Sequence, residues 1–214
     1  MVMRKLLLML CMAVSLTLQA QAPLKKATEA QAKAMVEKIN QKATSIKTLA
    51  CDFTQVKTLR FLNDKMTSQG KMYFDGTGKL RWEYTSPYSY TFILNGQKVY
   101  IKSGKSSHTI DIRQSKLFQS IAQVMMNSMT GKSLTNNSEF TCTMYTQGND
   151  WVADMVPQKK EMKKMFKAIR LRFDSTRQMV SQVEMTEQGG DTTLITLKDV
   201  KLNGKVDEKI FVAQ

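Results

Sequence analysis

The chain has 214 residues, with 32 Lys and Arg against 18 Asp and Glu, and a formal net charge of +14. Its length fits one domain with a buried core, and 42% hydrophobic residues with only three prolines exclude a fibrous or disordered chain. The single histidine excludes a histidine-rich metal site, while the basic excess leaves nucleic acid, a membrane surface or an acidic partner as alternatives.

Residues 1–20 have the pattern of a secretory signal peptide. Arg4 and Lys5 precede an apolar run that is too short to span a membrane, and small residues follow it. We favour cleavage near Ala20, because a cut after Ala22 would place Pro23 next to the broken bond. An uncleaved N-terminal anchor is the alternative. The expected product is one exported domain, 21–214.

The next elements are a helix and a series of strands. Apolar residues recur at helical spacing from Ala32 to Ile46, and the period changes to two at Leu49. Turn signals separate the later runs, and Asn95-Gly96 is the strongest hairpin signal. After the strand at Leu49, the predicted strands are 66–75, 79–85, 89–94, 97–102, 106–112, 139–146, 151–156, 168–174, 179–187 and 192–198.

Two further helical segments interrupt these strands. Residues 115–129 predict a helix with one broad apolar face, and 158–167 predict a lysine-dense turn or short helix. The apolar face of the first, a candidate lid, comprises Leu117, Phe118, Ile121, Met125 and Met129.

Consecutive hairpins predict an antiparallel sheet, and about ten or eleven strands curl on themselves. The expected fold is mainly β with an α lid: an unclosed antiparallel β-barrel with helices covering its concave face.

Cys51 and Cys142 each alternate with apolar neighbours, so we expect both to face the interior of a strand. Export would permit a disulfide between them, and two buried thiols are the alternative.

We find no pattern of catalytic residues. Gly104-Lys105-Ser106 and Gly131-Lys132-Ser133 resemble the end of a phosphate loop, but Val99 and Met126 stand where its first glycine is required. The carboxylates are scattered, and His108 lies in an alternating strand. We therefore expect no enzyme activity, no metal and no cofactor. The dispersed lysines and the export signal also argue against nucleic acid.

One basic cluster stands out from the dispersed lysines. Lys159, Lys160, Lys163 and Lys164 surround Met162. They are candidates for docking on an anionic membrane or an acidic partner. A solvated helical turn is the alternative.

An ordered set of residues resembles the outer-membrane lipoprotein carrier family, LolA, over essentially the whole chain after residue 20. The matching residues include Phe53, Gln55, Gly70, Tyr73, Leu80, Arg81, Trp82, Tyr84, Pro87, Asn95, Gly96 and Tyr100. The resemblance implies a periplasmic chaperone, expected to be a monomer. It would take lipoprotein acyl chains from an inner-membrane lipoprotein-releasing ABC transporter and pass them to an outer-membrane acceptor. A similar module for another lipid, a glycolipid or an envelope protein is the alternative.

The resemblance also turns one set of apolar strand residues into candidates for binding acyl chains, although spacing alone favours an ordinary core. They are Phe53, Met72, Phe74, Leu80, Trp82, Tyr84, Phe92, Leu94, Val99 and Ile101. In members of that family an arginine beside the turn at Gly76 holds the lid closed, whereas this chain has Asp75-Gly76-Thr77-Gly78. Arg81 is the nearest candidate for that latch and a further docking candidate.

Overall fold

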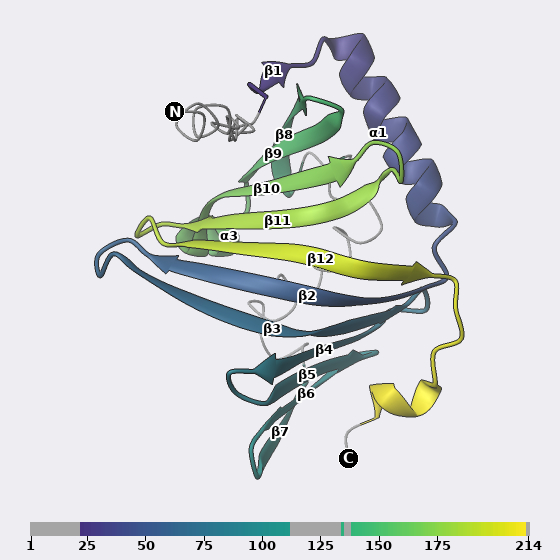
Figure 1. The fold of residues 1–214 in the computed structure, drawn as a ribbon, viewed down its shortest axis with the longest axis vertical. Helices are drawn as coiled ribbons and strands as arrows, with labels where there is room; N and C mark the ends of the chain where they lie inside the picture. Colours follow the sequence, from purple (N-terminus) through teal and green to yellow (C-terminus); the bar gives the residue numbers. More distant parts are fainter. Residues whose placement is uncertain (1–21, 112–133, 135–137, 213–214) are drawn as a thin grey trace, which may run out of the picture.

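The computed structural model describes residues 22–111, 134 and 138–212 (Figure 1). Within these residues, twelve strands form one antiparallel sheet that does not close, with the order β1-β8-β9-β10-β11-β12-β2-β3-β4-β5-β6-β7. The strands are β1 Lys25–Lys26, β2 Thr48–Leu59, β3 Asp64–Asp75, β4 Lys79–Ser86, β5 Tyr90–Asn95, β6 Lys98–Ser103, β7 Ser106–Asp111, β8 Phe140–Gln147, β9 Asp150–Pro157, β10 Phe166–Asp174, β11 Met179–Glu187 and β12 Thr192–Leu202.

The mainly β fold with an unclosed antiparallel sheet is confirmed, and its strand count needs a small correction. All the predicted strands are present, and the one not predicted is β1, which pairs with Thr146 and Tyr145 of β8. Two residues are too short to show an alternating pattern, so no local signal marks this strand. The predicted lid residues lie in 112–133, outside the described residues, as does the predicted signal peptide.

The helix α1, Glu29–Thr44, begins three residues before the predicted start because of its cap. The Thr28 hydroxyl accepts a hydrogen bond from the Gln31 amide, and the Gln31 side chain accepts one from the Thr28 amide. This reciprocal pair stabilises the first turn, whose amides have no partners within the helix. Ile46 lies in the connection to β2, so the predicted helix was two residues too long at its end.

The central strand pair joins residues from distant parts of the chain. Strand β12 pairs with β2 from Thr192–Thr58 to Leu202–Leu49. The Asn203 side chain accepts a hydrogen bond from the Lys47 amide and donates one to the Ser45 carbonyl, which fastens the end of β12 to the start of β2. Residues near both ends of the chain therefore form the middle of the sheet, not an edge.

One face of the sheet, here called the inner face, carries the apolar core. Cross-strand neighbours such as Cys51, Met72, Trp82, Phe92 and Ile101 form rows across this face. The core has two clusters that share Val183 and Met185. The β2–β6 cluster comprises Ile46, Leu49, Cys51, Phe53, Met72, Phe74, Leu80, Trp82, Leu94, Val99, Met179 and Ile195.

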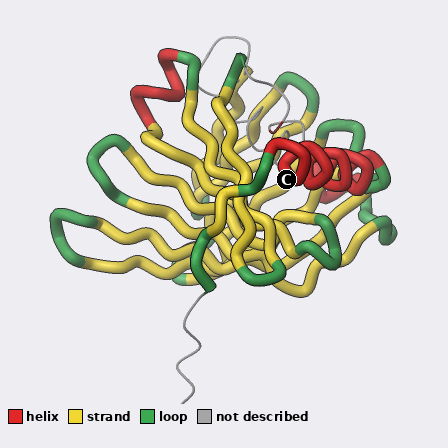
Figure 2. Tube along the Cα trace, turned by 90° about the horizontal axis from the view of Figure 1, so that it is seen from above, coloured by secondary structure: helices red, strands yellow, loops and turns green. Residues whose placement is uncertain are grey.

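The β8–β10 cluster is the second part of the core, and it includes helical residues. Met35 and Ile39 of α1 pack on it, and so does Met162 of the short helix α3, Lys160–Met165. Its remaining buried members are Leu134, Phe140, Met144, Ala153, Met155, Ile169, Leu171 and Phe173. Figure 2 shows α1 lying along one side of the twisted sheet.

The chain ends in the short 3-10 turn η3, Glu208–Phe211, which packs against β4 and β5. Figure 1 shows it beside the end of these strands. Phe211 is buried there, and its carbonyl accepts a hydrogen bond from the Asn95 side chain. This turn covers part of the opposite, outer face of the sheet.

Candidate functional site

The structure brings all ten predicted acyl-binding residues together on the inner face. Seven of them are buried in the β2–β6 cluster, and Tyr84, Phe92 and Ile101 pack against it half-buried. The buried seven are Phe53, Met72, Phe74, Leu80, Trp82, Leu94 and Val99. Seven of the ten predicted residues therefore have the burial of an ordinary core, and the other three lie half-buried at its margin.

Aromatic rings form a continuous row on this face. The Phe53 ring lies 4.3 Å from Trp82 and 5.3 Å from Tyr84, measured between ring centroids. Tyr84 in turn lies 6.0 Å from both Tyr88 and Tyr90. Because Tyr88 is exposed, the row leads from the buried core to the surface at the β4–β5 turn.

Gly70 makes this ring packing possible. A Cβ atom at Gly70 would lie 2.0 Å from the Glu83 carbonyl oxygen and 2.5 Å from Cζ of Phe53. Real side chains cannot approach so closely, so only glycine lets the Phe53 ring cross β3 at this point.

Two polar groups accompany the aromatic row. The Tyr84 hydroxyl donates a hydrogen bond of 2.8 Å to Oε1 of Gln55, and burial raises the pKa of Tyr84. The indole N–H of Trp82 is buried without a hydrogen bond of normal geometry among the described residues, and its polar neighbour is the Tyr84 hydroxyl, whose pKa it acts to lower against the effect of burial. The sequence marked Gln55 only as a motif residue, and the roles of Tyr88 and Tyr90 were missed.

Arg81 lies on the outer face, with its guanidinium held in place. Its Nε donates to Oε2 of Glu83 at 2.9 Å, and its Nη1 donates to the Ile210 carbonyl at 3.1 Å. Strands β11, β12, β2 and β3 separate β4 from β10, so the structure does not bring Arg81 together with the predicted lysine cluster. Arg81 connects the sheet to η3.

The β3–β4 turn, where the family latch was considered, is fastened by other groups. The Gly76 amide donates to the Lys47 carbonyl at 2.6 Å, and a Cβ at Gly76 would lie 3.0 Å from that oxygen. Lys79 forms ion pairs with Asp75 and with Glu208 of η3. Burial alone would raise the pKa of Asp75, but hydrogen bonding by Thr77 and the charge of Lys79 bring it below its usual range.

The four predicted docking lysines are all exposed, and they lie at the β9–β10 connection. Lys159 pairs with Glu139 at 2.6 Å. Met162 is buried beneath them, so this short helix is anchored in the β8–β10 cluster. A solvated turn and a docking surface have this geometry in common.

Cys51 and Cys142 are free thiols. Cys51 belongs to the β2–β6 cluster, whereas Cys142 packs against the β8–β10 cluster. Burial, and to a smaller extent Asp52, raises the pKa of Cys51 to about 12. Burial, with a smaller contribution from Asp154, raises the pKa of Cys142 to about 11. The sequence left open a Cys51–Cys142 disulfide or two separate thiols, and the structure has the two separate thiols.

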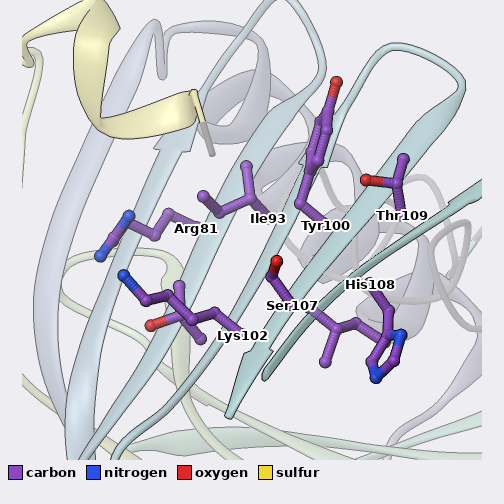
Figure 3. Close-up of a pocket in the computed structure, with 9 residues that line it drawn as sticks. Arg81, Ile93, Tyr100, Lys102, Ser107, His108 and Thr109 are labelled. Carbon is purple, nitrogen blue, oxygen red and sulfur yellow. The ribbon is translucent and has the colours of Figure 1, made fainter. Parts of the chain in front are cut away.

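The outer face carries a pocket of about 290 Å³ over β4–β7 (Figure 3). Its lining is Arg81, Thr91, Ile93, Tyr100, Ile101, Lys102, Ser107, His108 and Thr109. Only Ile101 among the predicted acyl-binding residues borders it. His108 is exposed on β7.

Among the described residues, no helix has both the length and the apolar character needed to cross a membrane.

Comparisons with known proteins agree with the resemblance. Residues 44–214 match the family model described as outer membrane lipoprotein carrier protein LolA. The chain is 26% identical over 171 residues to an outer-membrane lipoprotein carrier protein of Methylococcus capsulatus, covering 78% of this chain and 77% of that protein. It is 26% identical over 181 residues to the carrier protein of the same description from Pseudomonas aeruginosa, covering 83% and 82%. A conserved protein of Thermus thermophilus shares the fold, with a TM-score of 0.53 and 8% identity over 84% of this chain and 91% of that one.

Proposed function

Because the chain belongs to the LolA family of outer membrane lipoprotein carrier proteins, we propose that it carries lipoproteins by binding their acyl chains on its inner face. In this proposal the chain works in the periplasm after losing its signal peptide near Ala20. It receives lipoproteins from an ABC transporter of the inner membrane, and it delivers them to an acceptor at the outer membrane.

The inner face of β2–β6 is the observation that carries the proposal. It gathers a continuous apolar and aromatic surface whose margin, at Tyr84, Phe92 and Ile101, is half-buried. Each acyl CH₂ group that leaves water on such a surface contributes about 0.8 kcal/mol, so a chain of ordinary length binds well without polar contacts. The proposed role requires no catalytic residue.

Co-purification tests the proposal most directly. The chain is recovered from a periplasmic extract, and bound lipids and lipopeptides are identified by mass spectrometry. Ile101→Glu should remove the bound lipid, because it places a charge at the margin of the inner face. Tyr100→Glu is the matched control, because it changes the half-buried neighbour on the outer face. Recovery of no lipid, or equal lipid in Ile101→Glu and wild type, would contradict the proposal.

Trp82→Glu is a stronger test of the same face. It should abolish lipid recovery, but Trp82 is buried, so its effect counts only where circular dichroism shows a folded chain.

The alternative within the same fold is a binding module for another lipid, a glycolipid or an envelope protein. The mass of the co-purified molecule separates these alternatives. Depletion of the protein should leave lipoproteins in the inner membrane if the carrier role is right, and it should leave their distribution unchanged if the cargo is different.

A further inference from the structure

Three connections meet at one end of the sheet, on the left of Figure 1. The Gln188 amide, at the β11–β12 hairpin, donates to the Met165 carbonyl of α3 at 3.1 Å. On the other side of that hairpin, Asp191 accepts a hydrogen bond of 2.9 Å from the Arg60 amide at the β2–β3 hairpin. Hydrogen bonds therefore join α3, the β11–β12 hairpin and the β2–β3 hairpin into one surface, here called the tip surface.

Large apolar side chains project from the tip surface. Phe61 and Leu62 occupy the β2–β3 turn, where 97% and 66% of each residue is exposed. Met66 follows on β3 and is also exposed. Proteins bury most of their large apolar side chains, so two adjacent ones at the end of a hairpin indicate a surface that is covered in use.

Basic side chains surround these apolar residues. The exposed ones are Arg60, Lys65, Lys160, Lys163, Lys164 and Lys167, against which stand Asp64, Glu161 and Asp191. Lys57 and Lys159 also lie here but are paired with Glu187 and Glu139. The tip surface therefore keeps an excess of positive charge beside its apolar end.

We propose that the tip surface docks on an anionic lipid bilayer, with Phe61 and Leu62 inserted among the acyl chains and the lysines among the headgroups. Apolar residues bordered by lysine and arginine are the composition of proteins that lie at a membrane surface. A projecting turn can enter a bilayer directly, whereas a protein partner would need a pocket shaped to receive both side chains. The exposed Tyr88 follows β4, which runs toward the same end of the sheet and whose last residue, Ser86, pairs with Gln69 in the middle of β3. The aromatic row of the inner face thus leads toward the membrane in this arrangement.

This docking goes beyond the carrier role and does not require bound cargo. The test is therefore sedimentation of the lipid-free protein with vesicles of phosphatidylethanolamine and phosphatidylglycerol, compared with vesicles of phosphatidylcholine. We expect binding to the anionic vesicles that weakens as salt is raised. The double variant Phe61→Ser/Leu62→Ser should bind anionic vesicles at least about tenfold more weakly than the wild type. Lys160→Glu/Lys164→Glu should lose most of the part of the binding that depends on salt.

Matched variants at the other end of the sheet serve as controls. Leu24→Ser/Val212→Ser removes two exposed apolar side chains, and Lys98→Glu/Lys205→Glu reverses two exposed charges. Both should bind as the wild type does. In a separate measurement, the tryptophan introduced by Phe61→Trp should shift its fluorescence emission to the blue on vesicle binding, and brominated acyl chains should quench it. The wild type, which has only Trp82 and Trp151, gives the background signal to subtract.

Four results would overturn the proposal. They are failure of the wild type to bind anionic vesicles, unchanged binding of Phe61→Ser/Leu62→Ser, equal weakening by the control variants, and no quenching at position 61. Loss of lipid recovery by Ile101→Glu with intact vesicle binding would show that carrying and docking are separate properties.

Discussion

The two parts of the sheet bury the same inner face in different ways. In the described residues, the β8–β10 cluster is covered by helical side chains, Met35 and Ile39 of α1 and Met162 of α3. Among the described residues, the buried members of the β2–β6 cluster come from strands and connections, and Tyr84, Phe92 and Ile101 pack half-buried against them. The helical side chains add buried apolar area to the β8–β10 cluster, whereas the half-buried side chains at the margin of the β2–β6 cluster are the ones that the proposed ligand would reach first.

The largest effect should come from Gly70→Ala, which removes the space that the Phe53 ring occupies over β3. The added Cβ meets a backbone oxygen that cannot move aside, so we expect a loss of about 3 kcal/mol or more in the free energy of unfolding. Urea denaturation measures it. Gly189→Ala is the control and should be nearly neutral, because a Cβ at Gly189 would have no atom of the described residues within 4 Å. A small effect at Gly70 would mean that the aromatic row does not depend on this close packing.

A matched pair of isoleucines compares the two clusters directly. Ile39→Ala opens a cavity beneath α1 and should cost about 3 kcal/mol of stability, while bound lipid is retained. Ile101→Ala, at the half-buried margin, should cost about 1 kcal/mol and reduce the recovered lipid. Thermal unfolding and lipid mass spectrometry on the same samples give both values. The comparison fails if Ile39→Ala loses more lipid than Ile101→Ala.

The smallest effect on stability is expected at Asp75, in the β3–β4 turn, where Lys79 pairs with both Asp75 and Glu208 of η3. Its pKa is lower in the folded chain than in the unfolded chain, so its carboxylate stabilises the fold above about pH 4, and this contribution is lost as the pH falls further. Asp75→Asn should cost about 1 kcal/mol at neutral pH, and the difference from wild type should vanish in acid. Urea denaturation across this range measures the difference. A difference that is constant with pH would show that the charge of Asp75 does not matter.

Most of the fold could be predicted because its strands alternate visibly in hydrophobicity. The two-residue β1 could not, and neither could η3, because both are too short for periodicity and are held by partners far away in sequence. The pairing of β2 with β12 could not be predicted either, because local sequence patterns do not indicate which distant strand lies beside β2.

The candidate site divides in the same way. Its ten apolar residues alternate along strands and were predicted together, and the register confirms that they share one face. Gln55 and Tyr88 were missed as site residues because their positions depend on packing between strands. Phe61 and Leu62 were missed because only the structure shows that they are exposed.

The pairing of β12 with β2 sets the order in which this molecule can be completed. Thr48 donates a hydrogen bond to the Gly204 carbonyl, 156 residues along the chain. Contacts between such distant residues form late, because a long loop must close before they stabilise anything. A ribosome must therefore finish nearly the whole chain before the centre of the sheet can form. Until then the segments that precede β12 remain without their central neighbour.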